Sequence, residues 1–285
     1  MNSYRGGAVT RRRNTIDPLV SIVVPALNEA LNLAAVLPQL PPVHEVILVD
    51  GGSVDGTVRA ARRAMPDIIT VLQRRRGKGN ALAAGFARAT GDIVVMFDAD
   101  GSADPAEIER FVEALKAGAD FAKGSRNAPG GGSGDITTVR HLGNRFLNGI
   151  FNTIFRTRYS DLCYGFNAFW ADLVPLLGLP DPSTGAPANG KMLWGDGFEI
   201  ETVISCRFAA AKVAITEVPS VEKQRMFGES NLHAVSDGLR VLVTLLAEWR
   251  RAWGTRRLER SVTVTVEPVK ETARATPRVG SHFAA

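Results

Sequence analysis

The sequence contains very few cysteines, since Cys163 and Cys206 are the only two among 285 residues. Two cysteines cannot form a disulfide-rich scaffold, and a chain of this length can build its core without one. Neither residue lies in a Cys-x-x-Cys pair or another metal-type spacing, which argues against a zinc site. We expect both to be small buried apolar side chains in a protein of a reducing compartment.

Long apolar segments are also missing. No stretch approaches the roughly 20 apolar residues that a helix needs to cross a bilayer. Residues 1–17 contain arginines but no apolar run behind them, which is not the pattern of a signal peptide. We therefore expect a cytoplasmic protein.

Two familiar nucleotide-binding motifs are absent. There is no G-x-x-x-x-G-K-[ST] loop, and no G-x-G-x-x-G follows the first strand, which argues against P-loop proteins and dinucleotide-binding dehydrogenases. The formal net charge is +5, but the basic residues are not interleaved with aromatic ones on one face, so nucleic acid is not an expected partner. Much of the positive charge lies near the two termini, where it either keeps the tails solvated or attracts an anionic surface.

Short apolar runs alternate with helical segments in the first half of the chain. This alternation predicts an α/β fold with a mostly parallel central sheet covered by helices on both faces. We expect strands at 19–25, 45–49, 68–72 and 93–97 and helices at 28–40, 57–65, 79–89 and 105–117.

The second half is less regular. It predicts a helix at 140–155, strand character at 159–170, a helix at 197–211, a strand at 213–219 and a helix at 233–253, with loops at 127–135 (Gly-rich and mobile) and 181–190. We expect one domain over 18–232, a C-terminal amphipathic helix over 233–254, and little fixed structure in 1–17 and 255–285.

Two carboxylates follow the fourth strand. Asp98 and Asp100 are two residues apart on an extended segment, so both side chains point the same way. Like charges that close repel each other unless a cation joins them. Because ligands bind beyond the carboxyl ends of parallel strands, the pair predicts a site for a divalent cation that bridges to a diphosphate. The alternative is a turn with two solvated aspartates.

Other strand ends carry polar residues as well. Asp50 ends the second strand and could accept hydrogen bonds from a nucleobase or a ribose, whereas Ser53 and Asp55 suit turn and helix-cap positions. Residues 74–79 (R-R-R-G-K-G) follow the third strand and open a helix. Their charge, together with glycines that would let backbone N–H groups approach a phosphate, indicates either phosphate contact or a solvated basic face.

Taken together, the motifs resemble family 2 inverting glycosyltransferases with the GT-A nucleotide-diphosphosugar transferase fold, and most of all the dolichyl- and polyprenyl-phosphate mannosyl- and glucosyltransferases. The resemblance extends over about residues 19–249. It rests on the order and spacing of S-I-V-V-P-A-L-N-E (21–29), D-G-G-S-V-D-G-T (50–57), G-K-G-N-A-L-A-A-G (77–85), G-D-I-V-V-M-F-D-A-D (91–100), G-A-D-F-A-K-G-S-R (118–126) and R-M-F-G-E-S-N-L (225–232).

This resemblance implies roles for the matched residues on the donor side. Asp98 and Asp100 would hold Mg²⁺ or Mn²⁺ against the diphosphate of GDP-mannose or UDP-glucose, with Ser102 beside them where the family often has Gln. Arg225 would clamp the diphosphate, and Lys78 lies in the basic segment expected at the phosphates. The residues that would line the base and ribose pocket are Pro25, Asn28, Glu29 and Asp50.

The acceptor side follows the same resemblance. Arg126, Arg140 and Asn144 match positions that handle an acceptor phosphate, and arginine suits phosphate because it binds two oxygens at once. Glu201 matches the family's glutamate near the acceptor. Further candidates are Asp161 and Tyr164 for the sugar pocket and His233 for the acceptor site; each also has a purely structural interpretation.

The expected reaction is a single displacement with inversion, in which a hexose passes to a polyprenyl phosphate, with Asp100, Glu201 and Arg225 as the catalytic group. Segment 239–253 combines leucine, valine and tryptophan with arginine, as interfacial helices do. We therefore expect peripheral contact with an anionic membrane at its inner face, or else a helix packed on the core. Two alternatives stay open: a transferase acting on a sugar hydroxyl, with Glu201 or Asp196 as general base, and a non-catalytic nucleotide-binding protein of the same fold.

Overall fold

The computed structural model describes residue 13 and residues 15–134, 138–228 and 234–261. Its centre is a seven-stranded sheet in the order β3-β2-β1-β4-β7-β5-β8. All neighbouring strands are parallel except β7, which is antiparallel to both β4 and β5. The strands are β1 (Val20–Ala26), β2 (Glu45–Asp50), β3 (Ile69–Leu72), β4 (Ile93–Met96), β5 (Phe121–Ser125), β7 (Asn167–Trp170) and β8 (Ile215–Pro219).

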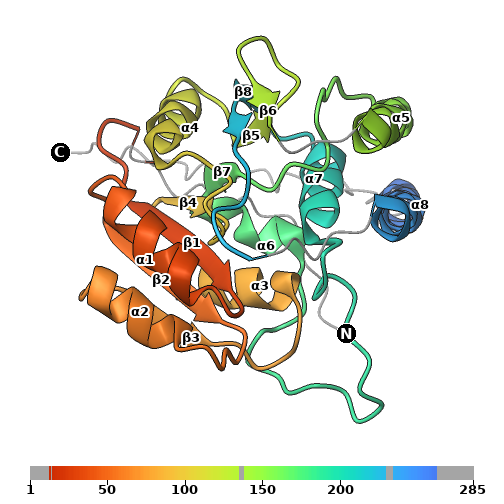
Figure 1. Ribbon diagram of the computed structural model, residues 1–285. Coiled ribbons are helices and arrows are strands. Elements are labelled where there is room, and N and C mark those ends of the chain that lie inside the picture. The colour runs from red at the N-terminus through yellow and green to blue at the C-terminus, as the bar shows by residue number, and fades with distance from the viewer. Residues whose placement is uncertain (1–12, 14, 135–137, 229–233, 262–285) are drawn as a thin grey trace, which may run out of the picture.

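Helices cover the sheet, as Figure 1 shows. They are α1 (Ala30–Val36), α2 (Thr57–Ala64), α3 (Lys78–Arg88), α4 (Ile108–Lys116), α5 (Thr138–Phe155), α6 (Val174–Leu177), α7 (Ile200–Ala211) and α8 (Ala234–Ser261), with 3-10 turns η1 (Leu37–Gln39), η2 (Pro105–Glu107) and η3 (Ala171–Leu173). α8 packs against α5 and α7 at the side of the molecule away from β3. The prediction of an α/β fold with a mostly parallel sheet is confirmed.

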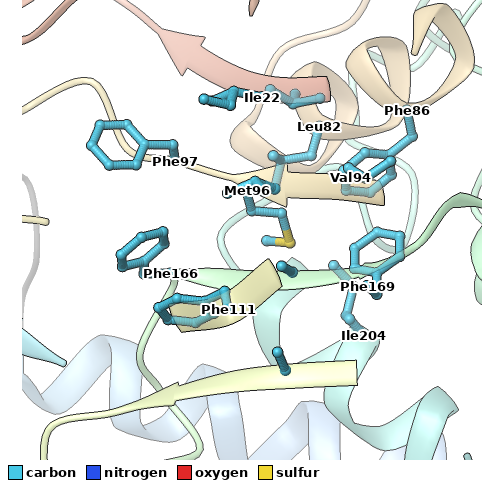
Figure 2. Close-up of a cluster of buried hydrophobic side chains, with 14 of the residues drawn as sticks. Ile22, Leu82, Phe86, Val94, Met96, Phe97, Phe111, Phe166, Phe169 and Ile204 are labelled. Atoms are coloured by element: carbon cyan, nitrogen blue, oxygen red, sulfur yellow. The ribbon is translucent and has the colours of Figure 1, made fainter. Parts of the chain in front are cut away.

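The core lies on both faces of the sheet, and aromatic side chains of β7 and the segment before it link the two layers (Figure 2). On one face Phe169 packs edge-to-face against Phe86 of α3 and Phe208 of α7. Phe166 packs against Phe111 of α4, at a centroid distance of 4.3 Å. Because this packing fixes α3, α4 and α7 on the sheet, the loops that these helices begin are held in fixed positions at its edge.

The strand order changes direction between β1 and β4. From β1 the chain proceeds outward to β2 and β3 and then returns to place β4 on the other side of β1. In open parallel sheets, a crevice forms beyond the carboxyl ends of the strands at such a point. The segments that follow β1 and β4 are 27–29 and 97–102, so the polar residues predicted from the sequence meet here.

Several predicted boundaries need correction. Only Asn167–Trp170 of the predicted strand 159–170 pairs in the sheet. The Gly-rich loop contains a short strand, β6 (Gly132–Ser133), which pairs in parallel with β9 (Val221–Glu222). The C-terminal helix continues to Ser261 instead of ending near residue 254.

The N-terminal segment is also less free than the sequence suggested. Arg13 forms ion pairs with Asp120 and Asp172 and stacks over the ring of Trp170, 5.3 Å from its centroid. Asp120 precedes β5, and Asp172 follows the antiparallel strand β7, so both lie at the end of the sheet opposite the crevice. The contacts attach residue 13 to that end. The remaining residues up to 12, and residue 14, lie outside the described part of the chain.

Candidate active site

Asp98 forms an ion pair with Lys78, the first residue of α3. The Lys78 Nζ lies 2.7 Å from Oδ1 and 3.0 Å from Oδ2 of Asp98, and 2.6 Å from Oε1 of Glu201 in the first turn of α7. Burial alone would lower the pKa of Lys78, but the charges of Asp98 and Glu201 raise it well above the ordinary lysine value. Lys78 is therefore a fixed positive charge between two carboxylates.

The second carboxylate of the pair faces a different basic side chain. Asp100 Oδ2 lies 3.4 Å from Nη1 of Arg225, and Asp100 Oδ1 accepts a hydrogen bond from the backbone N–H of Ser102. The two aspartates are close enough to affect each other: removal from bulk water raises the pKa of Asp98, and the charge of Asp100 raises it further. The predicted acidic pair thus forms one site, with about a third of the Asp98 side chain and a quarter of the Asp100 side chain exposed.

Arg225 belongs to a segment that is fastened over the end of β4. The backbone N–H of Met226 donates to Asp100 O, and that of Lys223 donates to Ser102 O. The Arg225 guanidinium also pairs with Oε1 of Glu29 at 2.5 Å. The same glutamate accepts a hydrogen bond from Asn32, and Asn32 holds the backbone of Phe227 by two further hydrogen bonds. The end of the R-M-F-G-E-S-N-L motif (229–232) and the candidate His233 lie outside the described residues.

Two predicted donor-site residues at the ends of β1 and β2, Asn28 and Asp50, differ in their hydrogen bonds. Asp50 is buried, and its Oδ2 accepts hydrogen bonds from the N–H groups of Gly52 and Ser53, whereas its Oδ1 accepts none from the described residues. Asn28 has a left-handed backbone with φ of 58°, and its Oδ1 accepts a hydrogen bond from Val54 N–H. Asn28 therefore joins the two loops, and Asp50 retains an oxygen for a further donor.

Gly165 lies beside the charged cluster of Lys78, Asp98 and Glu201. A Cβ on this residue would lie 3.1 Å from Oδ2 of Asp98 and 3.4 Å from both Oε1 of Glu201 and Nζ of Lys78. No strand or helix includes Gly165, and it was not among the predicted site residues. Its missing side chain leaves room next to the residues expected to carry the chemistry.

The basic segment 74–79 is used differently from the prediction. Arg75 is buried and forms a bidentate ion pair with Asp196, so it does not face a phosphate. A Cβ at Gly77 or Gly79 would overlap backbone atoms of residues 195–196, and the N–H of Gly79 donates to Gly197 O. The glycines allow two backbone segments to cross closely. The N–H group of Gly79 therefore bonds within the fold, and Arg75 fits neither of the two interpretations of this segment, phosphate contact or a solvated face.

The predicted acceptor residues Arg126 and Asn144 lie in a second buried cluster. Arg126 Nε is 2.6 Å from Oδ2 of Asp161, and its Nη1 is 3.0 Å from Glu222. Asn144 of α5 donates to Oδ1 of Asp161 at 2.8 Å, while its own Oδ1 has no partner among the described residues. The ring of Tyr164 stacks on Arg126, 5.0 Å away. Arg140 lies on α5 four residues before Asn144, and its side chain is outside the described part.

The acidic pair has the chemistry of a divalent-cation site. Aspartate oxygens are the ligands that Mg²⁺ and Mn²⁺ prefer, and Mg²⁺ is typically held by one or two carboxylates together with substrate phosphates. In the described ranges no group of three or more His, Cys, Asp or Glu side chains is placed to bind a metal ion. Asp98 and Asp100 would therefore supply only part of a coordination shell.

One surface outside the crevice is unusual. α8 buries Thr244, Leu245 and Glu248 and exposes a stripe of large apolar side chains beside Arg240, Arg250 and Arg251. Within this stripe Trp249 and Trp253 stack at 6.1 Å, and Trp253 is 63% exposed. The neighbouring α5 also exposes large apolar side chains, and both helices lie on the same side of the molecule (Figure 1). We call this surface the α5/α8 face; its apolar members are Leu142, Phe146, Leu239, Val243, Leu246, Trp249 and Trp253.

The sheet with its switch point and the carboxylate pair beyond β4 define a nucleotide-sugar-dependent glycosyltransferase of the GT-A type. The chain belongs to glycosyl transferase family 2, whose model matches residues 21–173.

Among its relatives, the polyprenol monophosphomannose synthase of Mycolicibacterium smegmatis is 29% identical over 240 residues, 80% of this chain and 85% of that protein. The undecaprenyl-phosphate mannosyltransferase of Micrococcus luteus is 30% identical over 223 residues, 75% of this chain and 87% of that protein. A solved structure with the same fold is the glucosyl-3-phosphoglycerate synthase of Mycobacterium tuberculosis in complex with Mn²⁺, UDP and glucosyl-3-phosphoglycerate. Its TM-score is 0.62 at 23% identity, covering 87% of this chain and 86% of that one.

Proposed function

We propose that this glycosyltransferase moves a hexose from a nucleoside diphosphate sugar to a polyprenyl phosphate, with inversion at the anomeric carbon. The observation that carries the acceptor assignment is that Glu201 and Asp196 are both occupied in ion pairs. Each of these candidate general bases is held by a basic side chain, Glu201 by Lys78 and Asp196 by Arg75. A hydroxyl acceptor needs a base to remove its proton, whereas a phosphate acceptor is already anionic. The names of the relatives from M. smegmatis and M. luteus agree with this choice.

The donor would bind at the end of the sheet between β1 and β4. Asp50, with its unpartnered buried oxygen, and the residues Pro25, Asn28 and Glu29 would receive the base and ribose. Asp98 and Asp100 would hold Mg²⁺ or Mn²⁺, which neutralises the diphosphate when bound. Arg225 would stabilise the leaving diphosphate, since a guanidinium can give two parallel hydrogen bonds to phosphate oxygens.

The acceptor phosphate would approach from α5. Arg126 pairs with Asp161 and Glu222, and Asn144 donates a hydrogen bond to Asp161, so this cluster fixes the end of α5 that carries Arg140. We propose that Arg140 contacts the phosphate and that Arg126 and Asn144 hold it in position. Transfer would then depend mainly on placing the phosphate oxygen in line with the anomeric carbon.

The α5/α8 face would rest on an anionic membrane, which is where a polyprenyl phosphate is found. Two stacked tryptophans that are exposed beside arginines suit a membrane interface, where both residue types are favoured. Arg240 and Arg250 flank the stripe and would attract anionic lipid headgroups. None of the helices in the described ranges has the length and apolarity of a membrane span. The location that we propose from the α5/α8 face is peripheral, at the cytoplasmic face of the membrane.

A transfer assay tests the reaction. The purified protein is incubated with Mn²⁺, labelled GDP-mannose or UDP-glucose, and either a polyprenyl phosphate or a panel of free sugars. We expect labelled product that extracts into organic solvent only with the lipid phosphate. Transfer to a sugar hydroxyl, with none to the lipid, would replace this proposal by an enzyme of glycan synthesis.

Flotation with vesicles tests the membrane contact separately. We expect the protein to float with vesicles containing phosphatidylglycerol at low salt, and the double variant Trp249→Ser/Trp253→Ser to remain in the soluble fraction. Leu72→Ser removes a similarly exposed apolar side chain from β3, far from the α5/α8 face, and should float like the wild type. Equal flotation of all three proteins would rule out this face as the contact.

A further inference from the structure

Asp98 already has a cation at its side. Both of its oxygens lie within 3.0 Å of the Lys78 ammonium, which also pairs with Glu201. Lys78 cannot easily be displaced as a whole, because Gly77 and Gly79 on either side of it pack against the backbone of residues 195–196. A divalent cation that uses Asp98 must therefore share this carboxylate with Lys78 or move the flexible end of its side chain away.

The charges around the acidic pair favour this competition. Carboxylates outnumber basic side chains in the cluster. Among the described residues, Lys78 and Arg225 are paired with the four carboxylates Asp98, Asp100, Glu29 and Glu201. Each basic side chain that stays in place lowers the attraction of the cluster for a divalent cation, and each one that leaves raises it. Lys78 is the stronger competitor, because it contacts both oxygens of Asp98 whereas Arg225 approaches Asp100 only to 3.4 Å.

We propose that Lys78 is an internal counter-ion that competes with the divalent cation for Asp98, and that a diphosphate relieves the competition by taking the place of Asp98 at the Lys78 ammonium, which keeps its contact with Glu201. Metal and nucleotide then strengthen each other's binding by the same factor, because such coupling is reciprocal. The metal binds poorly to the free protein and well once the nucleotide is present. This inference rests on the proposed metal and nucleotide site and deepens it by naming the residue that couples the two ligands.

The test is a Mn²⁺ titration of the full chain, followed by the electron paramagnetic resonance signal of free aqueous Mn²⁺, with and without saturating UDP or GDP. The Mn²⁺ that the nucleotide alone binds in solution is measured without protein and subtracted. Without nucleotide, Lys78→Met should bind Mn²⁺ at least about tenfold more tightly than the wild type, because unit charges this close interact strongly even near a protein surface. The enhancement by nucleotide should shrink in this variant. Lys78→Arg keeps the charge and should resemble the wild type. Lys116→Met, the same substitution in an ion pair on α4, should change nothing.

Each outcome separates the two proposals. Equal nucleotide-free affinity of the wild type and Lys78→Met, with normal binding in the presence of UDP or GDP, overturns the role of Lys78 and leaves the proposed function intact. Absence of Mn²⁺ binding by the wild type under every condition overturns the metal-dependent function itself. If Lys78→Met does not fold, Lys78→Gln replaces it. A wild type whose Mn²⁺ affinity is the same with and without nucleotide contradicts the coupling without any variant.

Discussion

The guanidinium of Arg75 and the carboxylate of Asp196 form a bidentate ion pair inside the protein, with Nε–Oδ2 and Nη2–Oδ1 distances of 2.7 and 2.9 Å. Their side chains are only 2% and 1% exposed. The pair joins the loop between β3 and α3, which leads to Lys78, to the loop before α7, which leads to Glu201. It therefore sets the separation of the two site residues without contacting the crevice itself.

Asp196→Asn should destabilise the protein by about 3–5 kcal/mol, because it leaves the Arg75 charge buried without its partner. The measurement is urea unfolding followed by circular dichroism. The double variant Arg75→Met/Asp196→Leu removes both charges and should recover most of the loss. If Asp196 were instead a general base, the single variant would fold normally and lose only sugar transfer.

Such long-range pairs mark the limit of sequence reasoning. β1, β2 and β4 were placed within two residues because they are continuous apolar runs, which parallel strands buried on both faces require. By contrast, Arg75 and Asp196 are 121 residues apart, and a run of arginines gives no sign that the middle one is buried. The sequence therefore indicated either phosphate contact or a solvated face for a segment whose Arg75 the fold places in a structural ion pair.

The predicted strand at 159–170 failed for a related reason. Its apolar residues Tyr159, Leu162, Tyr164 and Phe166 are indeed buried, but they fill the core from an irregular segment. The pattern of apolar residues indicates which side chains are buried, but not which backbone groups form hydrogen bonds in a sheet. The meeting of residues at one end of the sheet was therefore predictable where they follow directly from strand ends, as Asp50, Asp98 and Asp100 do. It was not predictable where distant loops cross, as at Gly165.

Gly165→Ala should lower sugar transfer about tenfold with little effect on stability, because small displacements of reacting groups are costly for catalysis. The new methyl group would press on Oδ2 of Asp98 at 3.1 Å and displace the Lys78 ammonium. Steady-state kinetics with the nucleotide sugar measures the effect. Gly185→Ala adds the same methyl group in an exposed loop where it meets no atom within 4 Å, and its kinetics should match the wild type. Unchanged turnover in Gly165→Ala would mean that the space beside the cluster is not used.

Arg225→Ala should reduce kcat/KM by about a hundredfold or more, because a preorganised donor to the developing charge is lost. Arg225→Lys should restore only part of this, since lysine lacks the forked guanidinium. The neighbouring Lys223 pairs with Asp104 on the surface, so Lys223→Ala is the matched control and should retain near-normal kinetics. Equal losses of kcat/KM in the Arg225 and Lys223 variants would indicate that the conformation of the segment matters and not the charge of Arg225.

Lys123 should make stability depend on pH. Its ammonium is fully buried in β5 and donates to the carbonyl oxygens of Tyr164 and Gly124 at 2.6 and 3.1 Å. Burial lowers its pKa to about 8, against the opposing charge of Asp161. An unfolded lysine keeps its proton to about pH 10.4, so between these values the unfolded chain binds more protons than the folded one, and stability must rise with pH.

The titration of Lys123 should raise the free energy of unfolding by about 2 kcal/mol between pH 8 and pH 10. It is measured as the difference in urea unfolding free energy between the wild type and Lys123→Met at the two pH values. Because other groups titrate equally in both proteins, the difference isolates Lys123. Lys116→Met, which removes a partly exposed lysine from α4, should follow the wild-type curve. Parallel curves for the wild type and Lys123→Met would show that Lys123 keeps its proton in the folded protein throughout this range.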